Sequence, residues 1–215
     1  MTRTLVRAVA FALASIVGAV TCGAAAARAA ETFYSPEVAG IDSTCNGSRA
    51  KAAPSDVIRV ARFPSGSGMG PWQLADASAI SRVENAPGFT SGEFVTLVLD
   101  RGAIVSADLV DDDVSSGKVL AHAWCFIGGK LSRATSDVTL PARADGYRRT
   151  RYYGDDVEQP IAEVMLQKGT DSKSYKPPPK ELDAVLVTVP YARPTDLPFY
   201  DVLAAVRAGT LARLK

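Results

Sequence analysis

Short stretches of β-type sequence, in which apolar and polar residues alternate or apolar residues run together, fill the middle of the chain. Asp56 to Phe63 alternates with a period of two, and Phe94 to Leu99 is a continuous run of aliphatic and β-branched residues. Five similar stretches follow, separated by turns that contain Gly or Asp, at residues 103–110, 119–126, 131–140, 147–153 and 161–166. This spacing is typical of antiparallel hairpins. We therefore predict a β-hairpin meander over residues 94–170.

The sequence after this meander predicts a crossover, a strand and a helix. Residues 173–180 (KSYKPPPK) contain three consecutive prolines, which favour an extended polyproline segment. Residues 184–189 are apolar on both sides of an extended chain and predict a buried strand. Residues 196–214 predict a C-terminal helix, with Asp196 as its cap and apolar residues along one side. Such a helix needs an apolar surface to cover, and a sheet face supplies one.

The fold class that follows is α+β: an antiparallel β-meander or curved sheet covered by a C-terminal helix. The segment before the meander is less regular. Residues 36–53 are compatible with a helix that Gly40 and Gly47 weaken, and residues 72–85 fit either a helix or an extended segment.

The first 29 residues have the three parts of a secretory signal peptide. Arg3 and Arg7 precede an uncharged apolar run, residues 8–20, and Ala27-Arg28-Ala29 follows as a cleavage site. Thirteen residues of helix rise only about 20 Å, too little for the roughly 30 Å of a bilayer core. We expect a single domain, residues 30–215, that is periplasmic or secreted and has no stable membrane span after cleavage. A retained membrane anchor or a lipid anchor on Cys22 are the alternatives.

Charge and cysteine content refine this view. Removing residues 1–29 takes away three arginines and no acidic residue, which leaves a charge of about −2. A nearly neutral chain has no field to attract nucleic acid, so no nucleic-acid partner is expected. Only Cys45 and Cys125 remain, and in an oxidising compartment they predict one disulfide. Two free thiols or an intermolecular bond are the alternatives.

No combination of residues predicts catalysis or a cofactor. His122, the only histidine, stands three residues before Cys125, and an odd spacing puts the two on opposite faces of a strand. Ser115 to Lys118 spells Ser-x-x-Lys, but in a turn. Asp111 to Asp113 offers oxygen ligands without the glycine and glutamate of an EF-hand loop, so only a weak calcium site of another kind stays open. We expect no catalytic residue and no metal site.

The segment YRRTRYY offers a candidate binding surface. On a strand, Tyr147, Arg149, Arg151 and Tyr153 share one face, where they could form an aromatic and cationic platform for a glycan, a carboxylate or a protein. The alternative is that these residues simply cover a sheet face, since tyrosine and arginine often do so.

Three functional hypotheses result. The first is an exported non-enzymatic protein that binds a protein partner or an envelope ligand through an exposed sheet face. The second is a hydrolase that uses carboxylates such as Asp108, Asp111 or Asp155 in a cleft. The third is a carrier that holds a small apolar ligand in a curved sheet.

Overall fold

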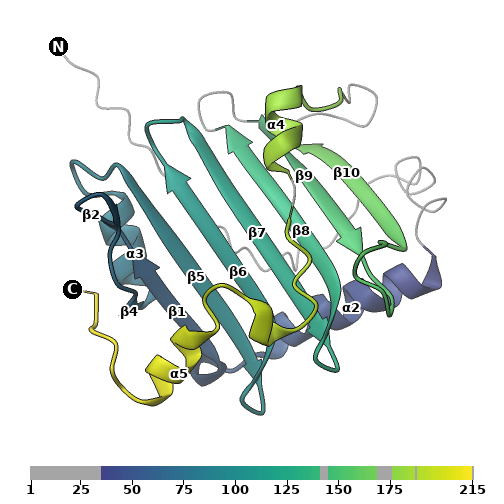
Figure 1. The fold of residues 1–215 in the computed structure, drawn as a ribbon, viewed down its shortest axis with the longest axis horizontal. Coiled ribbons are helices and arrows are strands. Elements are labelled where there is room, and N and C mark those ends of the chain that lie inside the picture. Colours follow the sequence, from purple (N-terminus) through teal and green to yellow (C-terminus); the bar gives the residue numbers. More distant parts are fainter. Residues whose placement is uncertain (1–34, 141–144, 169–175, 187, 215) are drawn as a thin grey trace, which may run out of the picture.

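The computed structural model describes residues 35–140, 145–168, 176–186 and 188–214, which build one large antiparallel sheet with helices on both faces (Figure 1). The eight strands lie in the order β10-β9-β8-β7-β6-β5-β1-β4. Their bounds are β1 Val57–Arg62, β4 Gln73–Ala75, β5 Ser91–Asp100, β6 Ala103–Asp113, β7 Lys118–Ile127, β8 Lys130–Leu140, β9 Asp145–Tyr152 and β10 Ala162–Lys168. A separate small hairpin joins β2 Pro64–Ser65 to β3 Gly68–Met69. The predicted meander and α+β class are confirmed.

Each face of the sheet carries its own helices. We call the side to which Cys125 points the disulfide face, and the side to which Trp124 points the C-terminal face, because successive strand residues point to opposite sides. Figure 1 shows α2 (Pro36–Lys51) and α3 (Ala77–Glu84) behind the sheet, and α4 (Lys180–Val185) and α5 (Asp201–Arg207) in front. Two short 3-10 turns complete the set, η1 Pro54–Asp56 and η2 Pro194–Asp196.

The main core lies on the C-terminal face. Trp124 of β7 is 3% exposed, its ring centroid lies 6.0 Å from that of Phe199, and its Nε1 donates to the carbonyl of Val189 at 2.8 Å. Leu203 of α5 packs in the same cluster. The C-terminal segment therefore covers a sheet face, as the sequence predicted.

The C-terminal helix is shorter than the predicted 196–214. Asp196 does not cap it, because this carboxylate accepts from the backbone N–H of Arg193 at 3.0 Å and closes η2 instead. The helix α5 starts at Asp201 and ends before Gly209, whose φ of +66° favours glycine. The residues that follow run beside β4.

The prediction of a strand at residues 184–189 is wrong, because Lys180–Val185 forms helix α4. A short run that is apolar on all sides does not distinguish a buried strand from a buried helix. Here Leu182 and Leu186, four residues apart, pack on Val138 of β8. Of the predicted Pro-rich crossover, residues 176–179 lack regular structure and 173–175 lie outside the described residues.

Capping residues define both helices of the disulfide face. The Ser35 hydroxyl accepts from the N–H of Val38 and starts α2, which runs through both of its glycines. Asp76 accepts from the N–H of Ala79 at 2.8 Å and starts α3, so that residues 72–85 combine strand β4 with a helix.

Residues 1–34, and with them the expected signal peptide, lie outside the described residues. Within the part of the chain that is described, no helix has the length and apolar character needed to cross a membrane.

Candidate binding surface

The four side chains expected to form an exposed platform lie against α4, β10 and the core. Tyr147 is 6% exposed and packs with Leu182 of α4. Tyr153 is 3% exposed and belongs to the main core. The prediction that Tyr147, Arg149, Arg151 and Tyr153 form an exposed surface is therefore wrong.

The two arginines of this set connect neighbouring elements. Arg149 forms an ion pair with Asp183 of α4, and its Nη1 donates to the carbonyl of Leu186 at 3.2 Å. Its Nε lies 3.5 Å from a Glu163 carboxylate oxygen, while Arg151 Nε donates to the other oxygen at 2.6 Å. These contacts attach β10 and α4 to β9. Alternation alone could not show this, because the covering helix was itself predicted as a strand.

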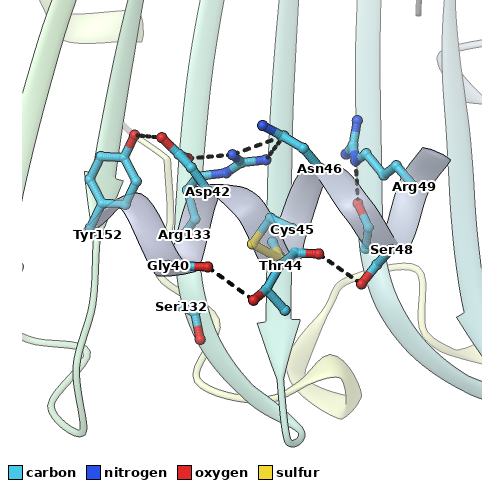
Figure 2. The surroundings of a disulfide bond; sticks show 12 residues. Gly40, Asp42, Thr44, Cys45, Asn46, Ser48, Arg49, Ser132, Arg133 and Tyr152 are labelled. Carbon is cyan, nitrogen blue, oxygen red and sulfur yellow. Dashed lines mark hydrogen bonds and ion pairs between the residues drawn. A yellow bond between two sulfur atoms is a disulfide. The ribbon is translucent and has the colours of Figure 1, made fainter. Parts of the chain in front are cut away.

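A disulfide and a set of ion pairs hold α2 on the opposite face (Figure 2). Cys45 and Cys125 are bonded, with a Cα–Cα distance of 5.9 Å, which confirms the predicted disulfide. Figure 2 shows Asp42 between Arg133 and Tyr152: its two oxygens accept from the guanidinium at 2.6 Å and from the phenol at 2.9 Å. The helix is thus fixed to β7, β8 and β9 at one end.

The other end of α2 is fixed to β6. Arg49 forms an ion pair with Asp108, and its Nε donates to Ser106 Oγ at 2.8 Å. Burial raises the pKa of Asp108, and the charge and hydrogen bond of Arg49 oppose this rise. The pair therefore compensates a desolvated carboxylate, which is a structural role.

A serine and a histidine meet on the C-terminal face. His122 Nδ1 lies 3.1 Å from Ser136 Oγ, directly opposite on the neighbouring strand, and Ser136 also bonds to Thr188. Ser136 is 1% exposed, and burial lowers the pKa of His122. The cluster fixes the C-terminal segment to the sheet. Sequence reasoning missed it because the β7–β8 register, which includes a bulge, brings the two residues together.

The three carboxylates proposed for hydrolysis lie apart. Asp108 is paired under α2, whereas Asp111, three residues along the same strand, points to the opposite face. Asp155 lies in an exposed loop and pairs with Lys130 at 3.0 Å. They do not form the facing pair that this mechanism needs.

The acidic turn after β6 is closed by its own serines. Asp113 accepts from the N–H of Ser115 at 2.9 Å and from its hydroxyl at 2.6 Å.

Burial, together with the charge of Asp112, raises the pKa of Glu84 to about 7. In the described residues no three His, Cys, Asp or Glu side chains are grouped so that they could hold a metal ion.

The two edges of the sheet differ. At one edge, residues 212–214 of the same chain cover the outer side of β4. The N–H of Leu74 donates to the carbonyl of Ala212, and the N–H of Leu214 donates to the carbonyl of Leu74, both at 2.8 Å. At the other edge stands β10, seven residues long, and no further strand of the described chain pairs with its outer side. Figure 1 shows β10 at the end of the sheet opposite the C-terminus.

Next to this edge lies a part of the disulfide face that neither α2 nor α3 covers. The α2 helix contacts β6, β7 and β8 and, through Asp42, Tyr152 at the end of β9, whereas α3 packs through Ile80 on Ala61 and Phe94. The register places eight further side chains of this face in adjacent rows over β7 to β10. We call them the open face: Ala121, Ala123, Thr135, Asp137, Arg148, Thr150, Val164 and Leu166.

The open face is built mostly from small and β-branched side chains, of which Thr150 is buried, and Val164 and Leu166 of β10 form its apolar margin. Leu166 of β10 is 51% exposed, and Val164 beside it is partly exposed. Arg148 and Asp137 form an ion pair at 2.7 Å. The sheet edge that no described strand covers and an exposed apolar side chain thus occur on the same strand.

Comparisons with known proteins add no information on the function of this chain. No family model matches the chain, and neither the curated proteins nor the solved structures contain a match.

Proposed function

We propose that this chain is an exported, non-enzymatic binding protein that takes up an extended segment of a protein partner along the outer edge of β10. The contrast between the two sheet edges carries this proposal. The chain covers β4 with its own residues 212–214, whereas no strand of the described chain pairs with the outer side of β10. An uncovered strand presents a row of backbone donors and acceptors that another strand can pair with.

The side chains of β10 support this use of the edge. In strand addition, backbone hydrogen bonds supply affinity and alternate side chains supply specificity. Val164 and Leu166 extend the open face to the edge, so a strand bound there would meet an apolar margin. The strand contains no proline, and its Glu163 is already neutralised by two arginines. Of the usual features that discourage edge pairing, β10 has only a lysine, Lys168, at its last position.

Export is part of the proposal. A disulfide that joins residues 80 positions apart persists in an oxidising compartment, which supports a periplasmic or secreted location. The signal-like sequence of residues 1–29 supports the same location.

The placement of the reactive groups supports a non-enzymatic role. Ser136 is buried beneath Thr188, and the three candidate carboxylates point to different places. The ion pairs of α2 and α4 are used to hold helices on the sheet.

Site-specific photo-crosslinking tests this function. A photoreactive amino acid would replace Leu166 or, as a matched control, Val114, which is 43% exposed in the turn between β6 and β7. In cells that export the full chain, we expect protein adducts from position 166 and few from position 114. Equal labelling at both positions, or none at position 166, would contradict binding at β10.

A further inference from the structure

We infer that the strand added at β10 comes from a second copy of this chain, which would form a two-fold dimer with one sheet running through both molecules. This inference rests on the proposed function and specifies its partner. The observation behind it is that β10 is complementary to itself in an antiparallel register.

The geometry of the sheet restricts the possible registers. Residues directly opposite in an antiparallel pair point to the same face, so a two-fold axis perpendicular to the sheet must pass through a residue position. Only an axis at Met165 pairs all seven residues of β10, which runs from Ala162 to Lys168. This register is therefore the one that forms the most backbone hydrogen bonds.

In this register no like charges face each other. Glu163 stands opposite Gln167, and Lys168 stands opposite Ala162. Glu163 keeps its ion pairs with Arg149 and Arg151 of the same chain, because these lie on the inner side of β10. Pairing therefore brings no electrostatic penalty of the kind that opposed like charges produce.

The apolar side chains match as well. Val164 stands opposite Leu166, and the two-fold axis repeats this pair, so four apolar side chains meet on the joined open faces. Leu166, which is 51% exposed in the single chain, would be covered at this junction. Cross-strand pairs of aliphatic residues are a usual source of sheet stability.

Cysteine cross-linking tests the register. In the Met165→Cys variant, the two new cysteines would face each other with Cα atoms about 5 Å apart, within the range of a disulfide. In the control Gln167→Cys, on the same strand and face, the two positions would be displaced by four residues, about 13 Å. We expect the exported full chain to form a covalent dimer with the first variant and not with the second.

A charge substitution tests the dimer without new cysteines. Leu166→Lys should weaken dimerisation by about tenfold, since the change occurs twice at the junction, whereas Val114→Lys should leave it unchanged. Sedimentation equilibrium of the full chain would measure both. A monomer up to the highest soluble concentration, or equal cross-linking of the two cysteine variants, overturns the inference.

This outcome can be separated from failure of the proposed function. If the chain is monomeric but position 166 still crosslinks another protein, binding at β10 stands and the second copy is excluded. If position 166 gives no adduct of either kind, both proposals fail.

Discussion

At the scale of single residues, buried polar contacts matter more than the exposed ion pairs. The Lys130–Asp155 pair is largely in solvent, with side chains 68% and 96% exposed, and such pairs contribute little to stability. The Arg133–Asp42 pair is only 16% and 24% exposed, and Tyr152 bonds to the same carboxylate. Removing either charge from this pair would leave the other desolvated and unpaired, which is strongly destabilising.

Glu84 provides a prediction about pH. Its folded pKa of about 7 exceeds the usual 4.5 because of burial and of Asp112. A group with a raised folded pKa contributes stability below its unfolded pKa and loses it as the pH rises through the folded pKa. Glu84→Gln should therefore stabilise the protein by about 1 kcal/mol at pH 8, a figure that allows for solvent screening, and change little at pH 4. Urea unfolding at both pH values would measure this.

The comparison with wild type at each pH removes the effect of His122. Burial lowers the pKa of His122, so this residue favours the folded state more as the pH rises towards 6.5, opposite to Glu84. As a second variant, Asp112→Asn should lower the pKa of Glu84 towards its usual value. A stability difference between wild type and Glu84→Gln that is the same at pH 4 and pH 8 would contradict the assignment.

At the scale of elements, α2 is the helix that depends most on covalent and ionic attachment. Its sequence contains two glycines, and its buried residues are Val38 and Cys45. Helices with few buried apolar residues gain little from packing. The disulfide and the pairs made by Asp42 and Arg49 therefore substitute for an apolar side.

Replacing both cysteines with serine should lower the free energy of unfolding by about 4.5 kcal/mol, the loop-closure value for an 80-residue span. Urea unfolding of wild type and of Cys45→Ser/Cys125→Ser would measure the loss. The α2 helix should also become the most rapidly exchanging helix in hydrogen exchange. Unchanged exchange in α2 with unchanged stability would show that the ion pairs suffice.

How much of this fold the sequence could predict depended on the element. Alternation located β1 because a two-residue period has no helical counterpart, and the spacing of short apolar stretches between turns located β10. The run at 184–189 failed, since apolar residues on all sides fit a buried helix equally well. The binding surface failed for the same reason: Tyr147 and Arg149 lie under that unpredicted helix. The position of β10 at the edge of the described sheet could not be predicted, because strand order is a tertiary property.

At the scale of the whole molecule, the two edges determine how far strand pairing can extend. A sheet with one free edge can form a closed pair, whereas a sheet with two free edges can add copies at both ends without closing. The C-terminal residues 212–214 occupy one edge, where they bond twice to Leu74. In the dimer inferred above, this short segment would therefore prevent further copies from adding at β4.

Deleting residues 211–215 tests this view. The change removes two backbone hydrogen bonds and the apolar contacts of Leu211 and Leu214, so the free energy of unfolding should fall by about 2 kcal/mol. Because β4 is then uncovered, sedimentation velocity should detect species larger than a dimer. Adding Leu166→Lys to the shortened chain should reduce these species, since the β10 junction would be weakened. A shortened chain that is destabilised yet never exceeds a dimer would show that the three-residue strand β4 is too short to pair on its own.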